Sequence, residues 1–164
     1  LALAVGIEMD VIRAAIKEFK GLPHRCEWVA SVSGVEFYND SKGTNVGATM
    51  AAIEGLGQHI DGHIILIAGG VGKGADFRSL VPVINRWGKE VILIGQDAVE
   101  MASNFDKDIN TYFATDMEDA VSTAFEHGTA GDAVLLSPAC ASFDMFDNFQ
   151  HRGHSFIKSV EQLR

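Results

Sequence analysis

The sequence has 164 residues, of which 47% are apolar and 21% are charged, enough for one domain with a sizeable core and too few for two ordinary domains. Its 13 basic and 22 acidic residues give a net charge of −9, so phosphate backbones and anionic lipid surfaces would repel it. No apolar run reaches the roughly 20 residues of a membrane-spanning helix, and the first ten residues lack a basic leader and a cleavage site. We therefore expect a cytoplasmic protein that binds neither nucleic acid nor membranes.

The cysteines and histidines give no sign of a metal centre or a cysteine nucleophile. Cys26 and Cys140 lie far apart, without cysteine or histidine at the spacing of a zinc site, so we expect both to be reduced and structural. Cys140 lies between two alanines with no neighbouring base, which disfavours a nucleophile. His151 and His154 share a helical face without a carboxylate cluster, and we interpret them as solvent-exposed side chains.

The first 20 residues differ in pattern from the rest. Residues 1–5 are apolar without a helix-start signal, as if a helix had been cut. Asp10 is expected to cap a second helix that runs through Ile16 to Phe19. Residues 20–23, with the sequence KGLP, are expected to form a hinge into the main domain.

The remaining chain shows the pattern of a sheet with mainly parallel strands. Residues 28–32 and 35–38 flank Ser33-Gly34 and predict an antiparallel hairpin at one side of the sheet. Residues 111–114 predict a further strand. Almost wholly apolar runs bounded by glycine are typical of parallel strands buried on both faces, and they occur at residues 64–68, 91–94 and 133–136.

Apolar residues at helical spacing predict helices between these strands, at residues 46–56, 117–125 and 156–163. Another helix is expected to begin with Ser79 as N-cap and to run through Pro82, in its first turn, to Trp87. About six strands with helices between them predict an α/β fold, a Rossmann-like, doubly wound and mainly parallel sheet flanked by helices.

In such a sheet, ligands bind beyond the carboxyl ends of the strands, so the loops there are candidates for a site. Residues 39–45, with the sequence NDSKGTN, place Asp40, Lys42 and Thr44 ahead of a helix start. A helix N-terminus with a lysine nearby favours an anion. A capped turn with a solvated carboxylate and lysine explains the composition equally well.

Residues 69–74, with the sequence GGVGKG, resemble a phosphate loop in which glycines admit a ligand and Lys73 supplies a charge. The P-loop pattern requires glycine five residues before the Gly-Lys pair and serine or threonine after it, where this sequence has Ile67 and Gly74. We therefore do not expect a self-sufficient P-loop here, and a flexible turn remains the alternative.

A third loop, from Ser137 to Asp144, consists mostly of small residues and leads into a helix whose free amides suit a carboxylate or phosphate. Helix capping by Ser142 or Asp144 is the simpler explanation. Arg25 in the expected hinge region is suited to bind a phosphate bidentately if another domain brings one.

Four segments in this order resemble the Mur ligases of peptidoglycan synthesis, and the last segment and the glycine loop resemble the members that add D-glutamate. They are GLPHR at 21–25, NDSKGTN at 39–45, GGVGK at 69–73 and LLSPACASFDMFDNFQHRG at 135–153. The resemblance implies an amide bond made with ATP. In the implied reaction, the carboxylate of UDP-N-acetylmuramoyl-L-alanine is phosphorylated and the amine of D-glutamate attacks the acyl phosphate.

The resemblance also implies roles for individual residues. Arg25 and Lys42 would contact the nucleotide phosphates, and Asp40 the ribose hydroxyls. Thr44 and Lys73 would hold the α-carboxylate of D-glutamate. The side-chain carboxylate would be held by a further pair, Ser142 and the backbone amide of Phe149.

By the same resemblance, residues 1–20 are the trailing helices of a central ATPase domain and the hinge, and residues 21–164 are a C-terminal amino-acid-binding domain. The P-loop, the magnesium site and the UDP site would lie in domains outside this sequence, so the fragment alone is expected to be inactive. Two alternatives stay open, namely another amino-acid specificity within the family and a non-enzymatic nucleotide-binding module. The second is disfavoured because no GxGxxG follows the first strand.

Overall fold

The computed structural model of the chain describes residues 1–19 and 21–164. Its sheet has six strands in the order β1-β2-β6-β3-β4-β5, in which β1 and β2 are antiparallel and all other neighbours are parallel. The strands are β1 (Glu27–Val32), β2 (Val35–Asn39), β3 (Ile64–Gly69), β4 (Gly88–Ile94), β5 (Thr111–Phe113) and β6 (Ala133–Leu136). This arrangement confirms the predicted mainly parallel sheet with a hairpin at one side.

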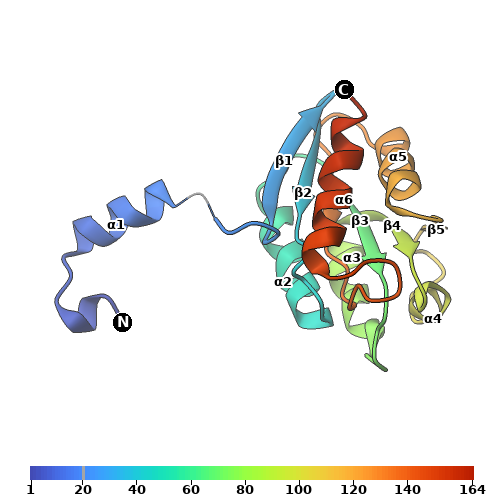
Figure 1. Ribbon diagram of the computed structural model, residues 1–164, viewed down its shortest axis with the longest axis horizontal. Helices are drawn as coiled ribbons and strands as arrows, with labels where there is room; N and C mark the ends of the chain where they lie inside the picture. Colours follow the sequence, from blue (N-terminus) through green and yellow to red (C-terminus); the bar gives the residue numbers. More distant parts are fainter. Residues whose placement is uncertain (20) are drawn as a thin grey trace.

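Helices cover both faces of the sheet, as the doubly wound pattern predicts (Figure 1). Helices α5 and α6 pack on one face, and α2, α3 and α4 pack on the other. Their bounds are α2 (Val46–Gly57), α3 (Val81–Trp87), α4 (Ala98–Ser103), α5 (Met117–His127) and α6 (Phe149–Glu161), with a short 3₁₀ helix η2 (Phe77–Leu80) before α3.

The central strands alternate between two apolar cores. Along β3, Ile65 and Ile67 contribute to the core under α5 and α6, whereas Ile64, Leu66 and Ala68 contribute to the opposite core. All five side chains are buried, because each face of the sheet is covered by helices. This two-sided burial explains why the apolar runs of the sequence lack alternation.

The N-terminal segment contains the 3₁₀ helix η1 (Leu3–Val5) and helix α1 (Met9–Glu18), which have no buried residue. Figure 1 shows α1 at a distance from the sheet and its helices. In the expected hinge, Lys20 lies outside the described residues, and Gly21 has a φ of 84°. Among the described residues, no helix is long and apolar enough to span a membrane.

Three predicted helix starts were wrong. Asp10 lies within the first turn of α1, whose N-cap position is Glu8, and no side chain caps it. Ser79 lies inside η2, where Asp76 is the N-cap and accepts a hydrogen bond from the Arg78 amide. The helix expected directly after the small residues of the third loop begins only at Phe149, with Asn148 rather than Ser142 or Asp144 as its cap. The caps were wrong because several consecutive residues can accept such a bond, and tertiary packing selects one.

At the amino ends of the strands, opposite the candidate loops, Asp132 binds several segments of the chain. Its buried carboxylate accepts hydrogen bonds from the His63 amide, from the amide and hydroxyl of Thr129, and from Lys89 Nζ at 2.9 Å. Burial alone would raise the pKa of Asp132, but these donors outweigh it and lower the pKa to about 2. The ionised form therefore contributes to stability at neutral pH.

We expect Asp132→Asn to lower the free energy of unfolding at pH 7 by about 2 kcal/mol, because charge-assisted hydrogen bonds are lost. The pKa of Asp132 in the folded protein lies below its ordinary 3.8, so this contribution is complete above about pH 4 and declines as the pH falls toward 2. Urea unfolding across this range measures both effects. The exposed carboxylate in Asp61→Asn is the control, and equal effects of the two substitutions would contradict the assignment.

Candidate functional site

Three loops follow the neighbouring strands β2, β6 and β3, and direct backbone hydrogen bonds join them at the carboxyl edge of the sheet. The amide of Ala139, in the 137–148 loop, donates to the carbonyl of Gly43, in the 39–45 loop, at 2.9 Å. On the other side, Val71 of the 69–74 loop forms a two-bond antiparallel bridge with Ala141. The three candidate loops therefore form one connected surface.

The buried side chain of Arg152, from the first turns of α6, also joins two of these loops. Its guanidinium donates to the carbonyl and hydroxyl oxygens of Ser41 and to the carbonyl oxygen of Cys140, at 2.9 to 3.2 Å. Burial lowers the pKa of Arg152 to about 10, so the group stays protonated at neutral pH. A permanent positive charge thus lies beneath the site.

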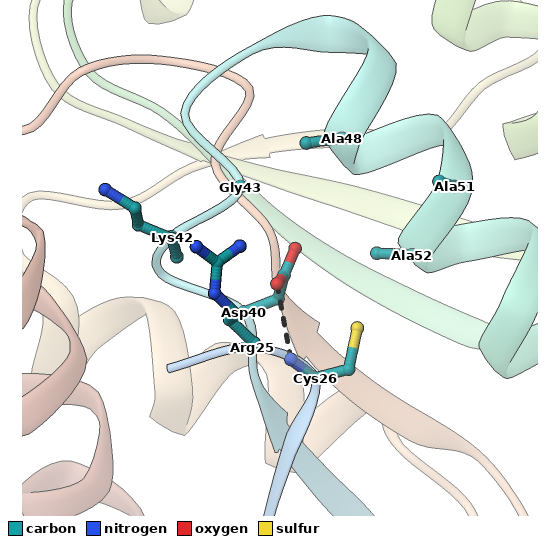
Figure 2. A pocket seen from close by; sticks show the side chains of 8 residues that line it. All are labelled: Arg25, Cys26, Asp40, Lys42, Gly43, Ala48, Ala51 and Ala52. Atoms are coloured by element: carbon teal, nitrogen blue, oxygen red, sulfur yellow. Dashed lines mark hydrogen bonds between the residues drawn. The ribbon is translucent and has the colours of Figure 1, made fainter. Parts of the chain in front are cut away.

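A cavity of about 300 Å³ lies between this surface and α2 (Figure 2). Arg25, Asp40 and Lys42 line it, and alanines of α2 form the facing wall. The predicted nucleotide residues are therefore brought together, although Arg25 precedes β1 and the other two follow β2. Arg25 reaches the cavity because its neighbours bind the 39–45 loop: the Lys42 amide donates to the carbonyl of His24, and the Cys26 amide donates to Asp40.

Asp40 is the buried acidic group of this cavity. Its Oδ1 accepts from the Cys26 amide at 3.2 Å, and its Oδ2 accepts from the hydroxyl of Ser137 at 2.7 Å. Burial raises the pKa of Asp40 above its ordinary value, while the bonds from Ser137 and Cys26 and the charge of Arg25 act in the opposite direction. Each carboxylate oxygen keeps a further lone pair for a ligand hydroxyl.

A close approach at Gly43 keeps this arrangement compact. A Cβ on Gly43 would overlap Asp40 Oδ2 and lie 2.6 Å from Ser137 Oγ, and both of these atoms belong to buried side chains. Glycine at this position therefore allows the hydrogen bond between Asp40 and Ser137 to form directly under the loop.

A second cavity of about 300 Å³ shares Cys26, Ala51 and Ala52 with the first and extends along α2 to Tyr38 and His59. Apart from His59 and the Tyr38 hydroxyl, its lining is apolar or small. The two cavities together form a groove with a charged end and a largely apolar end, which suits a ligand that has a charged part and a flat apolar part.

Three of the four residues predicted to bind the amino acid lie on the connected loops, and the fourth, Phe149, directly follows them. Thr44 is partly exposed before α2, Lys73 is exposed on the 69–74 loop, and Ser142 is buried on the 137–148 loop. Phe149 is the first residue of α6, where backbone N–H groups have no acceptor within the helix. Its ring also packs under Lys42, whose Nζ lies 4.1 Å from the ring centroid.

The predictions of free cysteines and of exposed histidines on α6 are confirmed. Cys26 and Cys140 are free, and burial raises the pKa of Cys140 to about 12, so its thiol is protonated at neutral pH. His151 and His154 are exposed. Within residues 1–19 and 21–164, no cluster of three or more histidine, cysteine, aspartate or glutamate side chains is arranged to hold a metal ion.

Sequence reasoning missed residues that shape the site from below. Arg152 lies in a segment that carries the family resemblance, but its burial and its two loop partners depend on tertiary structure. Asp97 follows β4 and accepts from the Gly72 amide at 2.7 Å. The rule that singled out the other loops at the carboxyl ends of strands applies equally to Asp97 and would have found it.

Comparisons with known proteins agree with this arrangement. Residues 24–140 match the family described as "Mur ligase, glutamate ligase domain". The chain is 49% identical over 163 residues to the UDP-N-acetylmuramoylalanine–D-glutamate ligase of Pseudomonas fluorescens, and 50% identical to ligases of that name from Pseudomonas aeruginosa and Coxiella burnetii. These alignments cover 99% of this chain but only 36% or 37% of each relative, so the chain spans little more than a third of their length.

Solved structures share the fold at low sequence identity. A MurF ligase from Thermotoga maritima in complex with ADP matches with a TM-score of 0.68 and 18% identity, covering 99% of this chain and 36% of that one. A bifunctional folylpolyglutamate synthase/dihydrofolate synthase from Yersinia pestis matches with a TM-score of 0.64 and 20% identity, covering 99% and 37%. These matches confirm the predicted Rossmann-like α/β fold.

We expect Gly43→Ala to lower the free energy of unfolding by about 1 to 3 kcal/mol, because the new methyl group must displace Asp40 or Ser137. Gly47→Ala is the matched control, since its Cβ would meet only Asn45 Oδ1 at 3.5 Å and alanine favours the helix there. Urea unfolding of both variants makes the comparison. A Gly43→Ala variant as stable as Gly47→Ala would contradict the close approach.

Replacing Arg152 with methionine should lower the free energy of unfolding by about 3 kcal/mol, because buried carbonyl groups of two loops lose their donors. Arg78→Met, at an exposed pair with Asp76, should leave stability essentially unchanged. Urea denaturation measures both. Comparable losses in the two variants would show that the buried contacts of Arg152 do not hold the loops.

Proposed function

The chain belongs to the Mur ligase family, and from that premise we propose that it is the C-terminal domain of an ATP-dependent ligase that adds D-glutamate to UDP-N-acetylmuramoyl-L-alanine. The observation that carries the proposal is the identity of 49 to 50% across almost the whole chain to ligases of that name. Because the chain spans only 36% of these relatives, the activity belongs to a longer protein.

The cavity along α2 takes part of the nucleotide. Arg25 and Lys42 supply positive charge for the phosphates, and Asp40 accepts hydrogen bonds from the ribose hydroxyls. A cavity of about 300 Å³ with two cations and one buried carboxylate is well suited to a polyphosphate with a sugar beside it. The structure of a fold relative in complex with ADP supports a nucleotide ligand, although that relative is only 18% identical.

The joined loops take D-glutamate. Thr44 and Lys73 hold its α-carboxylate, while Ser142 and the amide of Phe149 hold its side-chain carboxylate. Two anion sites on loops joined by hydrogen bonds suit a substrate with two carboxylates at a fixed separation. The residues of this chain bind the amino acid and orient its amine toward the acyl phosphate made with ATP.

In the part of the chain that the structure describes, no group of three histidine, cysteine, aspartate or glutamate side chains is arranged to hold a metal ion. We place the magnesium site, the P-loop and the UDP site in the part of the protein that precedes this chain. Residues 1–20 are the trailing helices of that part with the hinge, and residues 21–164 are the C-terminal domain. The whole enzyme works in the bacterial cytoplasm on small-molecule substrates, without a nucleic-acid or membrane partner.

The direct test is an assay of the full-length protein for ADP release from ATP in the presence of UDP-N-acetylmuramoyl-L-alanine and one amino acid. D-glutamate is expected to support turnover, and L-alanine, lysine and meso-diaminopimelate are the comparison substrates. A preference for one of these comparison substrates would agree with the family but contradict D-glutamate as the substrate. ATP or ADP binding without turnover on any of them would favour a binding module.

In the same assay, Lys73→Ala should raise the KM for D-glutamate roughly tenfold or more and lower kcat, because a charge that binds and orients the nucleophile is lost. Lys42→Ala should instead raise the KM for ATP. Each variant serves as the control for the other. If the effects on the two substrates are reversed, the roles of these lysines are exchanged.

A further inference from the structure

A fourth loop lies at the carboxyl edge of the sheet, formed by Gly95, Gln96 and Asp97 between β4 and α4. It contacts the 69–74 loop, because the Asp97 amide donates to the carbonyl of Gly70 at 3.0 Å and Asp97 Oδ2 accepts from the Gly72 amide at 2.7 Å. Asp97 therefore holds the backbone immediately before Lys73 through one hydrogen bond that it donates and one that it accepts.

The carboxylate of Asp97 does not cap its own helix, and within the 95–97 loop its Oδ1 accepts a long hydrogen bond of 3.4 Å from Gln96 Nε2. Asp97 occupies the N-cap position of α4, where an aspartate ordinarily accepts from an amide of its own helix, yet no side-chain capping bond forms. The carboxylate reaches instead to Gly72, 25 residues earlier in the chain. A bond between an ionised acceptor and a backbone amide is stronger than a neutral one.

The backbone at Lys73, next to the residue that Asp97 holds, has an unfavourable conformation. Lys73 has a φ of 53°, in the left-handed region that costs a non-glycine residue roughly 1 kcal/mol or more. Such a conformation persists only where the surroundings impose it. Here the neighbours do so: Asp97 holds the Gly72 amide, the Ala75 amide donates to the Gly72 carbonyl at 3.0 Å, and Phe77 packs so closely on Gly72 that a Cβ there would lie 2.6 Å away.

The same loop also holds the opposite side of the site. Asp144 Oδ2, in the 137–148 loop, accepts from the Gln96 amide at 2.7 Å. The 95–97 loop therefore lies between the loop that carries Lys73 and the loop that carries Ser142, and it binds both through carboxylates.

We propose that Asp97 is a positioning residue that fixes the Gly72–Lys73 peptide and thereby places the Lys73 ammonium at the α-carboxylate of the amino-acid substrate. The role of Lys73 rests on the function proposed above, whereas the hydrogen bond between Asp97 and the Gly72 amide is a feature of the structure that does not depend on that function. Asp97 touches no substrate and acts through the backbone of the lysine loop.

The test uses the full-length enzyme with Asp97→Ala, Asp97→Asn and Glu100→Ala. Asp97→Ala should raise the KM for D-glutamate roughly tenfold and leave the KM for ATP within about twofold, because one charge-assisted hydrogen bond is lost at the amino-acid loop only. Asp97→Asn keeps an oxygen that accepts from the Gly72 amide, and it should recover most of the wild-type KM. Glu100→Ala removes an exposed carboxylate of the same helix and should change neither constant.

Coupling to Lys73 gives a second measure. If Asp97 acts through Lys73, the double variant Lys73→Ala/Asp97→Ala should be no worse for D-glutamate than Lys73→Ala alone. Additive effects, or equal losses for ATP and D-glutamate in Asp97→Ala, would overturn the positioning role.

Hydrogen exchange of the peptide that covers residues 70–76 separates this proposal from the proposed function. Exchange at the Gly72 amide should be faster in Asp97→Ala than in the wild type or Asp97→Asn, whatever the substrate. If the wild-type enzyme rejects D-glutamate while exchange follows this pattern, the proposed substrate is wrong, but Asp97 does hold the Gly72 amide. If D-glutamate is used and neither exchange nor KM changes in Asp97→Ala, the positioning proposal is wrong and the function stands.

Discussion

The candidate site depends on one buried guanidinium. Arg152 neutralises no carboxylate at hydrogen-bond distance; it donates to carbonyl and hydroxyl oxygens of Ser41 and Cys140. Those oxygens belong to loops that follow two adjacent strands and would otherwise turn toward solvent or remain unpaired. Since the pKa of Arg152 stays near 10 despite burial, the group binds both loops and adds a fixed positive charge below a surface that we propose for anions.

From this anchor, the surface is built mainly by backbone bonds, and its side chains divide into two kinds. Buried polar groups such as Asp40, Ser137 and Arg152 have partners within the protein and fix the loop positions. Charged groups at the rim, namely Arg25 and Lys73, are exposed. Binding can then order only the long exposed side chains, so the entropy cost is small compared with that of ordering a loop.

Most of the fold could be predicted from the sequence because a strand that is buried on both faces of a sheet is an uninterrupted apolar run. The uninterrupted apolar runs at 64–68, 91–94 and 133–136 all became strands, and the glycines at their ends became the turns that carry the loops. Helix starts were less predictable because Asp76, Ser79 and similar neighbours are chemically equivalent as caps. The motifs singled out the candidate loops, and the binding roles of their residues stay predictions. Arg152 and Asp97 were missed because Ser41 and Gly72, which they hold, lie 111 and 25 residues away in sequence.

The negative net charge of the protein is compatible with the anionic ligands that we propose, because the net charge and the local charges act over different distances. A protein with a charge of −9 repels anions at long range, but salt screens that repulsion beyond about 8 to 10 Å, and inside this range a ligand meets the local charges. At the site these are Arg25, Lys42 and Lys73 with the helix N-terminus at Phe149. The same edge of the sheet also carries acidic residues after β5, including Asp116 and Glu118. Under the function proposed above, a small phosphate or dicarboxylate would meet mainly the cations, while an extended polyanion would also have to cross the acidic surface.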